Sequence, residues 1–274
     1  MNNAINKAIN GISLAVPVSE HEYIGDDGLL HCAICHKRTQ TIVTVGDIER
    51  KVRCICDCRV KEINAHKERE AAEEVERKRR ICFSDSNMGS WTFENDDKQN
   101  EKLSRAMKRY CDDYINFRDE GKGLLLYGSV GTGKSYYAAC IANELITKGY
   151  SVLMTNFARL TNEIQGKFEG KNEYIDSLNR YSLLIIDDLG AERKSEYMQE
   201  IVFNIIDSRY RSGKPFIITT NLSADEIKKT QDIGYSRIYD RILERCFPIE
   251  IDGASRRRQN VKATFKDVKE RLGL

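Results

Sequence analysis

The sequence of 274 residues contains no hydrophobic run long enough to cross a membrane. Its most apolar stretches, such as residues 183–186, are far shorter than the roughly 20 residues that a bilayer-spanning helix needs. The first twenty residues hold a single Lys and a short apolar patch, without a small-residue cleavage site for export. These absences predict a cytoplasmic protein with no membrane partner.

Proline is scarce, and neither sign of charge dominates. Three Pro against 18 Gly, with 41% hydrophobic and 31% charged residues, indicate a globular chain and exclude a collagen-like or disordered one. Lys and Arg number 44 and Asp and Glu 42, so the net charge is only +2. A wholly basic surface of the kind that coats duplex DNA is therefore excluded, and any contact with nucleic acid must come from a local patch.

Cysteines are present but unevenly distributed. Five of the nine fall in one short segment: Cys32, Cys35, Cys54, Cys56 and Cys58. An odd total without an export signal argues against a disulfide framework, and the clustering favours a metal site. Four thiolates suffice for tetrahedral Zn²⁺, so one of the last three cysteines is spare, and His36 could replace a thiolate. Reduced buried cysteines and an iron–sulfur cluster are the alternatives.

A phosphate-binding loop follows the apolar segment GLLLY. The residues that match G-x-x-x-x-G-K-[ST] are Gly128, Ser129, Val130, Gly131, Thr132, Gly133, Lys134 and Ser135. Glycines let backbone amides wrap around phosphates, and the helix that follows points its positive end at them. We expect Lys134 to neutralise the β and γ phosphates of ATP and Ser135 to bind Mg²⁺.

Short apolar runs alternate with segments of helical spacing, beginning with the run directly before this loop and continuing after it. They lie at residues 124–127, 151–154, 183–186, 216–220 and 247–251. The alternation predicts an α/β fold, a parallel sheet with helices on both faces. Before the sheet, apolar residues between Leu103 and Phe117 recur at steps of three and four, which predicts a helix with one buried face.

Polar residues end two of these predicted strands. Asp187 and Asp188 follow the run 183–186, and Asn221 follows the run 216–220. Ligands of open α/β sheets bind at the carboxyl ends of the strands. We expect Asp187 to hold Mg²⁺, Asp188 to orient or deprotonate the attacking water, and Asn221 to position that water or sense the γ-phosphate, although Asn221 could instead cap a helix.

These motifs together resemble the AAA+ ATPases of the DnaC/DnaI helicase-loader group. The resemblance rests on GSVGTGKS, LLIIDDLG, IITTN, RIYDRILERC and FPIEIDGASRRR, in this order. It implies that Asn221 is sensor 1 and that Arg241 is an arginine finger acting on a neighbouring subunit, with Arg237 as second candidate. It also implies that one of Arg256, Arg257 and Arg258 is sensor 2, for which we prefer Arg257.

The resemblance implies an ATP-dependent loader that places the replicative hexameric DNA helicase on single-stranded DNA. The alternative is an IstB-like ATPase that assists DNA transposition. Many AAA+ proteins have Asp-Glu where this chain has Asp187-Asp188, so we expect slow ATP hydrolysis that a partner stimulates. Only about fifty residues follow Asn221, which predicts an abbreviated lid and a self-association that the helicase templates.

Two further expectations follow from the resemblance. Lys167 and Phe168 lie in the segment after the second strand, where a cation beside an aromatic could contact single-stranded DNA. Loaders of Gram-positive bacteria and phages carry an N-terminal zinc-binding domain that docks on the helicase. We therefore predict such a domain at residues 1–60, a charged helical linker at 61–90 and the AAA+ ATPase domain at 91–274.

Overall fold

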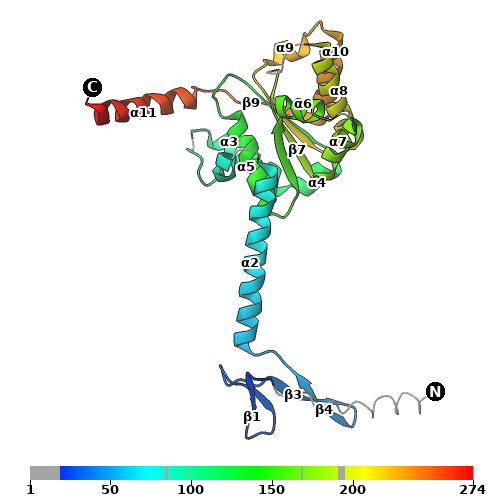
Figure 1. Ribbon diagram of the computed structural model, residues 1–274, viewed down its shortest axis with the longest axis vertical. Coiled ribbons are helices and arrows are strands. Elements are labelled where there is room, and N and C mark those ends of the chain that lie inside the picture. The colour runs from blue at the N-terminus through cyan, green and yellow to red at the C-terminus, as the bar shows by residue number, and fades with distance from the viewer. Residues whose placement is uncertain (1–18, 84–85, 98, 168, 191–194, 274) are drawn as a thin grey trace, which may run out of the picture. The chain divides into compact units, whose positions relative to one another are not determined.

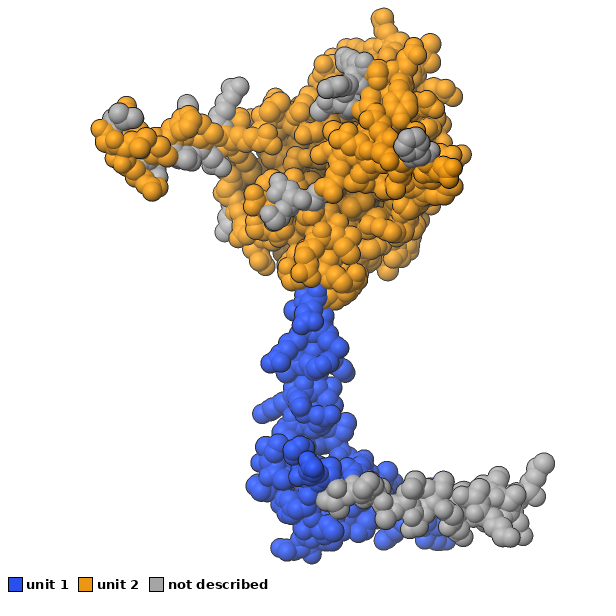
Figure 2. Space-filling view, in the orientation of Figure 1, with its two compact units in different colours: residues 1–73 blue, residues 74–274 orange. Residues whose placement is uncertain are grey.

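The computed structural model describes residues 19–83, 86–97, 99–167, 169–190 and 195–273 (Figure 1). It divides into two compact units, residues 1–73 and residues 74–274 (Figure 2). Helix α2 (Asp57–Cys82) runs from the first unit into the second and contains the charged segment for which a helix is predicted. No helix in the described ranges combines the length and apolarity that crossing a membrane requires.

The first unit is built from two small antiparallel sheets. Their strands are β1 (Glu22–Ile24) with β2 (Leu30–Cys32), and β3 (Gln40–Val45) with β4 (Ile48–Arg53). Gly46 and Asp47 form the turn between β3 and β4, and Gly46 has a φ of 64°, which favours glycine. Almost every residue of β3 and β4 is exposed, so hydrophobic burial contributes little to this unit.

The second unit contains a five-stranded parallel sheet. Its order is β6-β7-β8-β5-β9, and the strands are β5 (Gly123–Tyr127), β6 (Val152–Asn156), β7 (Leu183–Leu189), β8 (Phe216–Thr220) and β9 (Cys246–Glu250). All five predicted strands are confirmed. Strand β5 is the first strand of this sheet along the chain, yet it lies between β8 and β9. The loop after β5 therefore lies where the strand order reverses, which is the usual place for a ligand.

The second unit also contains helices, most of which lie around this sheet, while the last extends away from it (Figure 1). They are α3 (Glu101–Asp112), α4 (Tyr114–Asp119), α5 (Lys134–Thr147), α6 (Phe157–Gln165), α7 (Lys171–Ser177), α8 (Glu196–Arg211), α9 (Ala224–Lys228), α10 (Ile233–Arg245) and α11 (Arg256–Leu272), with the 3₁₀ turns Ser86–Ser90 and Leu178–Arg180.

The two faces of the sheet have separate cores because successive side chains of a strand point to opposite sides. Leu124 and Leu126 of β5 pack with buried residues of α3 and α5. Leu125, between them, packs with buried residues of α6, α8 and α10. The prediction of helices on both faces is thus confirmed.

The helix expected between Leu103 and Phe117 is divided in two. Helix α3 ends at Asp112, Asp113 adopts φ −99° and ψ 17°, and α4 begins at Tyr114. Tyr114 remains buried and Phe117 packs against the same core as α3. The periodicity continues across the break because both helices cover one face of the sheet.

Candidate functional site

The loop between β5 and α5 requires glycine. Gly128, Gly131 and Gly133 have φ of 140°, 84° and 107°, a region that other residues rarely adopt. A Cβ on Gly128 would lie 2.4 Å from the carbonyl oxygen of Ile251, and one on Gly131 would lie 2.3 Å from Ser255 Oγ. The loop therefore has no side chains at these positions and leaves its backbone accessible at the start of α5, as a phosphate-binding loop requires.

The helix that follows leaves its first amides available to an anion. No side chain caps α5, whose N-cap is Gly133. Lys134, the first residue of α5, is buried, and its Nζ donates to the carbonyl oxygens of Gly128 (2.9 Å) and Ser129 (2.7 Å). Burial lowers the pKa of Lys134. The ammonium is thus held inside the loop, where phosphate oxygens would stabilise its charge.

Two hydroxyls converge on Asp187 at the carboxyl end of β7. Ser135 Oγ donates to Asp187 Oδ1 at 2.8 Å, and Thr219 of β8 donates to the same oxygen. Burial raises the pKa of Asp187, and these hydrogen bonds oppose that rise. A largely buried carboxylate beside a serine hydroxyl is an oxygen-rich site of the kind that Mg²⁺ prefers.

Asp188 occupies a strained backbone position. Its φ of 58° is in the left-handed region, and the register of β7 with β8 shifts between Ile186 and Leu189. The amide of Asp188 donates to Thr219 Oγ1 at 2.9 Å, which holds this conformation. Such conformations persist where the surrounding structure enforces them, often at functional sites. Asp188 is exposed, whereas its neighbour Asp187 is largely buried.

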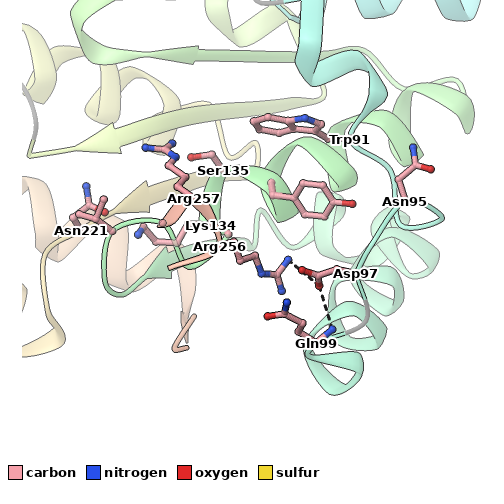
Figure 3. Close-up of a pocket in the computed structure, with 13 residues that line it drawn as sticks. Trp91, Asn95, Asp97, Gln99, Lys134, Ser135, Asn221, Arg256 and Arg257 are labelled. Carbon is pink, nitrogen blue, oxygen red and sulfur yellow. Dashed lines mark hydrogen bonds and ion pairs between the residues drawn. The ribbon is translucent and has the colours of Figure 1, made fainter. Parts of the chain in front are cut away.

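A cavity of about 430 Å³ opens beside the loop (Figure 3). The residues that line it are Trp91, Asn95, Asp97, Gln99, Val130, Gly131, Gly133, Lys134, Ser135, Tyr136, Asn221, Arg256 and Arg257. Asn221 and Lys134 lie at one end, and Asn95 and Asp97 lie at the other (Figure 3). The volume falls within the range of small-molecule pockets, about 300–1,000 Å³.

The end of the cavity away from Lys134 contains residues that the sequence analysis did not single out. The rings of Trp91 and Tyr136 lie with centroids 5.8 Å apart, and Asn95 Nδ2 donates to the carbonyl oxygen of Ser90, so its Oδ1 remains for a ligand. An aromatic surface with an amide beside it suits a planar base. Tyr136 directly follows the loop in the sequence, whereas only the fold brings Trp91 and Asn95 next to it.

Two of the three candidate sensor arginines line the cavity. Arg256 NH1 lies 3.3 Å from Asp97 Oδ1, and the backbone amide of Arg256 donates to the carbonyl oxygen of Gly131 at 2.9 Å. Arg257 is exposed and lines the same cavity. The side chain of Arg258 lies outside the described part of the chain. The start of α11 is therefore attached to the loop, and both Arg256 and Arg257 can face a nucleotide.

Arg241 makes contacts within its own chain. Its Nε donates to Asp207 Oδ1 at 2.8 Å, and its guanidinium lies over the rings of Phe203 and Tyr210. Arg237, one turn earlier on α10, is exposed and lies over the ring of Phe203, 5.4 Å from its centroid. Of the two candidate fingers, Arg237 is thus the more accessible.

The expected DNA contact is described only in part. Lys167 is exposed, and its ammonium lies 5.3 Å from the ring centroid of Tyr174. Phe168 lies outside the described residues. The expected DNA contact by Lys167 and Phe168 therefore stays a prediction.

In the first unit, four of the five clustered cysteines converge. The sulfur atoms of Cys32, Cys35, Cys56 and Cys58 all lie within 4.8 Å of one another. Tetrahedral zinc with Zn–S bonds of about 2.3 Å places its sulfurs about 3.8 Å apart, so this set fits the ion. Cys54 is outside the group, and its thiol donates to the carbonyl oxygen of Arg38. His36 is also outside, with Nδ1 3.1 Å from the hydroxyl of Tyr23.

Backbone amides favour ionised thiols in this group. Hydrogen bonds from the amides of Cys35 and Ile34 lower the pKa of Cys32 to about 6. The pKa of Cys58 is raised, chiefly by hydrogen bonds with the thiols of Cys56 and Cys32. Without a cation, four crowded thiols cannot all ionise, whereas a metal ligand must be a thiolate.

Comparison with protein families gives a match over most of the chain. The model of the family described as "IstB-like ATP binding protein" matches residues 67–264. This range includes the loop, Asp187, Asn221 and the arginines of α10 and α11, and the cysteine group precedes it.

Curated relatives are similar over a shorter stretch. The replicative helicase loader DnaI of Bacillus subtilis (strain 168) is 29% identical over 167 residues, which is 56% of this chain and 54% of the relative. The replicative helicase loader DnaC of Escherichia coli (strain K12) is 29% identical over 155 residues, 55% of this chain and 62% of the relative. The matched region thus spans little more than half the length of these relatives.

A solved structure has the same fold. The crystal structure of DnaI superimposes with a TM-score of 0.55 at 28% identity, covering 66% of this chain and 99% of that one. The parallel sheet and its helices are therefore those of an AAA+ ATPase core.

Proposed function

The chain belongs to the family of IstB-like ATP-binding proteins, and from this premise we propose that it is an ATP-dependent loader of the replicative DNA helicase. The observation that carries the proposal is that Lys134 and Ser135 line one cavity and that Ser135 donates a hydrogen bond to Asp187, in a fold shared with DnaI. The relatives named as replicative helicase loaders support the choice of partner.

The chemistry proposed is slow hydrolysis of ATP. Lys134 and the loop amides would bind the phosphates, and Ser135 and Asp187 would hold Mg²⁺, which would supply positive charge to the phosphates. Asp188 orients the attacking water, Asn221 contacts the terminal phosphate or that water, and Arg256 or Arg257 contacts the phosphates from α11. Trp91 and Tyr136 hold the base.

Hydrolysis is completed between subunits. We place the arginine finger on α10, where Arg241 is fixed by Asp207 while Arg237 is exposed. Arg237 therefore supplies the charge in trans, and the same role for Arg241 would require its ion pair to break. Assembly on the helicase brings the subunits together, and stimulation of hydrolysis follows from it.

The first unit serves as the helicase dock in this proposal. Zn²⁺ held by Cys32, Cys35, Cys56 and Cys58 would stabilise this unit, in which few of the described side chains are buried. Residues 1–60 form the dock, residues 61–90 the linker and residues 91–274 the ATPase. Because the cysteines lie outside residues 67–264, docking and ATP binding use different parts of the chain.

Size-exclusion chromatography with light scattering tests the proposal. The chain is mixed with the replicative helicase of its source, with and without ATP, beside Lys134→Ala, Cys32→Ser and the control Cys54→Ser. We expect a complex that survives Lys134→Ala and Cys54→Ser and does not form with Cys32→Ser. If no condition gives a complex, the loader is excluded, and the second candidate, an IstB-like transposition ATPase suggested by the family match, takes its place.

A further inference from the structure

The outer side of α3 presents four cations: Lys102, Arg105, Lys108 and Arg109. All four are exposed, and within the described residues none forms an ion pair or a side-chain hydrogen bond. Some cations elsewhere in the described residues are paired with acidic side chains. At the end of α2, for example, Arg77 lies 2.7 Å from Glu74 and Arg79 lies 2.6 Å from Glu76.

The four cations share one face because of helical periodicity. Leu103, Met107 and Tyr110 define the buried side of α3, and positions 102, 105, 108 and 109 lie opposite. The acidic residues on this outer side stand at the helix ends, where Asp112 is paired with Lys148 at 2.6 Å. The middle of the face is thus purely positive over about 10 Å, the rise of seven residues.

A groove runs beside this basic face. It has a volume of about 680 Å³, and α3 forms one wall while the first residues of β5 and β9 form the other. Arg109 belongs both to the basic face and to the groove. Across from it, the ring of Phe247 is 69% exposed on β9, the edge strand of the sheet. An aromatic ring this exposed is available to stack on a ligand.

We propose that this groove binds single-stranded DNA, with the α3 cations on the phosphates and Phe247 stacked on an unpaired base. A positive track beside an exposed ring is the arrangement that single-strand binding uses. Duplex DNA keeps its bases stacked inside and offers none to Phe247. A peptide strand added to β9 is disfavoured, since Pro248 in that strand has no N–H to donate.

The inference deepens the proposed function, on which it rests for the choice of DNA as ligand. It differs from the contact expected at Lys167, which lies after α6 and not on α3. Because the net charge of the chain is only +2, attraction of a polyanion must come from a local patch of cations such as this one.

Fluorescence anisotropy of the full chain with a labelled oligothymidine of about 15 nucleotides, over a series of salt concentrations, tests the inference. Each cation that no longer neutralises a phosphate of a single strand reduces the slope of log K against log [salt] by about 0.7. Arg105→Gln/Arg109→Gln should therefore reduce the slope by about 1.4. Lys228→Gln/Lys229→Gln, at the end of α9, makes the same change in net charge and should leave the slope unchanged.

Phe247→Ala tests the stacking step separately. It should weaken binding about tenfold without changing the slope, since it removes no charge, and the effect should vanish on an abasic strand of the same length. Phe247→Ala and Arg105→Gln/Arg109→Gln all lie at exposed positions outside the nucleotide cavity, so Tm and ATP binding should not change.

Three results would overturn the inference: a wild-type chain that does not bind the strand at low salt, a slope that falls with Lys167→Gln or the α9 pair instead of the α3 pair, or equal weakening of duplex binding in Phe247→Ala. The helicase complex, measured on the same variants, separates the two levels. If the complex forms but the DNA results differ from those expected, the DNA site in the groove is excluded while the proposed loader function is retained. If the complex does not form, the loader fails whatever the DNA results are.

Discussion

Asp187 is a largely buried carboxylate whose charge is costly until a cation arrives. Burial raises its pKa in the folded chain, so the folded state binds this proton more tightly than the unfolded state. The stability that this adds is present at low pH and is lost as pH rises through the raised pKa. Near neutral pH, the ionised group therefore destabilises the nucleotide-free protein.

We expect Asp187→Asn to raise Tm at pH 7 by about 2–4 °C, because the amide removes the charge and its oxygen still accepts from Ser135 and Thr219. The gain should shrink as pH falls and the wild-type carboxylate becomes protonated. The variant should also lose the part of the ATP-induced rise in Tm that depends on Mg²⁺. Differential scanning fluorimetry between about pH 4 and pH 8 measures all three effects.

Asp188→Asn is the matched control for this prediction. It removes the same charge from the next residue, which is exposed and whose left-handed φ of 58° Asn tolerates. Its Tm should stay close to that of the wild type at every pH. A lower Tm in Asp187→Asn than in Asp188→Asn at pH 7 would show that burial of the Asp187 charge is not destabilising.

Single residues of the site differ in how far the sequence predicts them. Lys134, Ser135 and Asp187 belong to contiguous motifs whose chemistry depends on spacing, and the structure brings them together. Thr219 bonds both Asp187 and the Asp188 amide, but the sequence assigns it no role although it lies within the motif IITTN, and Trp91 belongs to no motif. Their positions depend on strand register and on the path of the chain before α3, which local sequence does not specify.

Among the elements, the strands of the first unit depend most on a ligand. We expect the purified chain to contain one zinc per molecule, Cys56→Ser to lose most of it, and Cys54→Ser to retain it, because only Cys54 lies outside the four-sulfur group. Metal analysis of the three proteins after dialysis measures the difference. A chain that loses zinc equally in both variants would place Cys54 among the ligands.

Zinc removal should have a structural consequence limited to this unit. A chelator should unfold β1 to β4, where nearly every side chain of β3 and β4 is exposed, and leave the sheet β5 to β9 with its two buried cores intact. Circular dichroism would then show a small decrease of signal at unchanged ATP binding. If the chelator changes neither the circular dichroism signal nor ATP binding, a structural metal is excluded.

Elements are predicted more securely than their boundaries. The five parallel strands follow from apolar runs that only a doubly covered sheet can bury. The division of the first helix at Asp113 does not follow, since both pieces preserve one apolar period and no Gly or Pro marks the break. Likewise, the sequence does not decide which cysteine is spare, because Cys54, Cys56 and Cys58 stand at every second position. Only the path of the chain into α2 brings two of them, Cys56 and Cys58, into the group.

At the scale of the whole molecule, the proposed arginine finger would come from a second copy of the chain. Within one chain, the described arginines at the cavity are Arg256 and Arg257, while Arg237 and Arg241 lie on α10 against α8. An arginine finger contributes about 10³–10⁵-fold where it acts. We therefore expect Arg237→Ala to reduce helicase-stimulated ATP hydrolysis at least tenfold while Tm and ATP binding stay unchanged.

Mixing variants distinguishes a finger in trans from a residue that acts in its own chain. Lys134→Ala keeps Arg237 but cannot hydrolyse ATP, and Arg237→Ala keeps the loop but lacks the finger, so an equal mixture on the helicase should regain activity that neither has alone. Arg241→Ala should behave differently, with a lower Tm because the Asp207 ion pair is removed. If the mixture with Arg241→Ala regains activity and the mixture with Arg237→Ala does not, the finger is Arg241 and its ion pair must open on assembly.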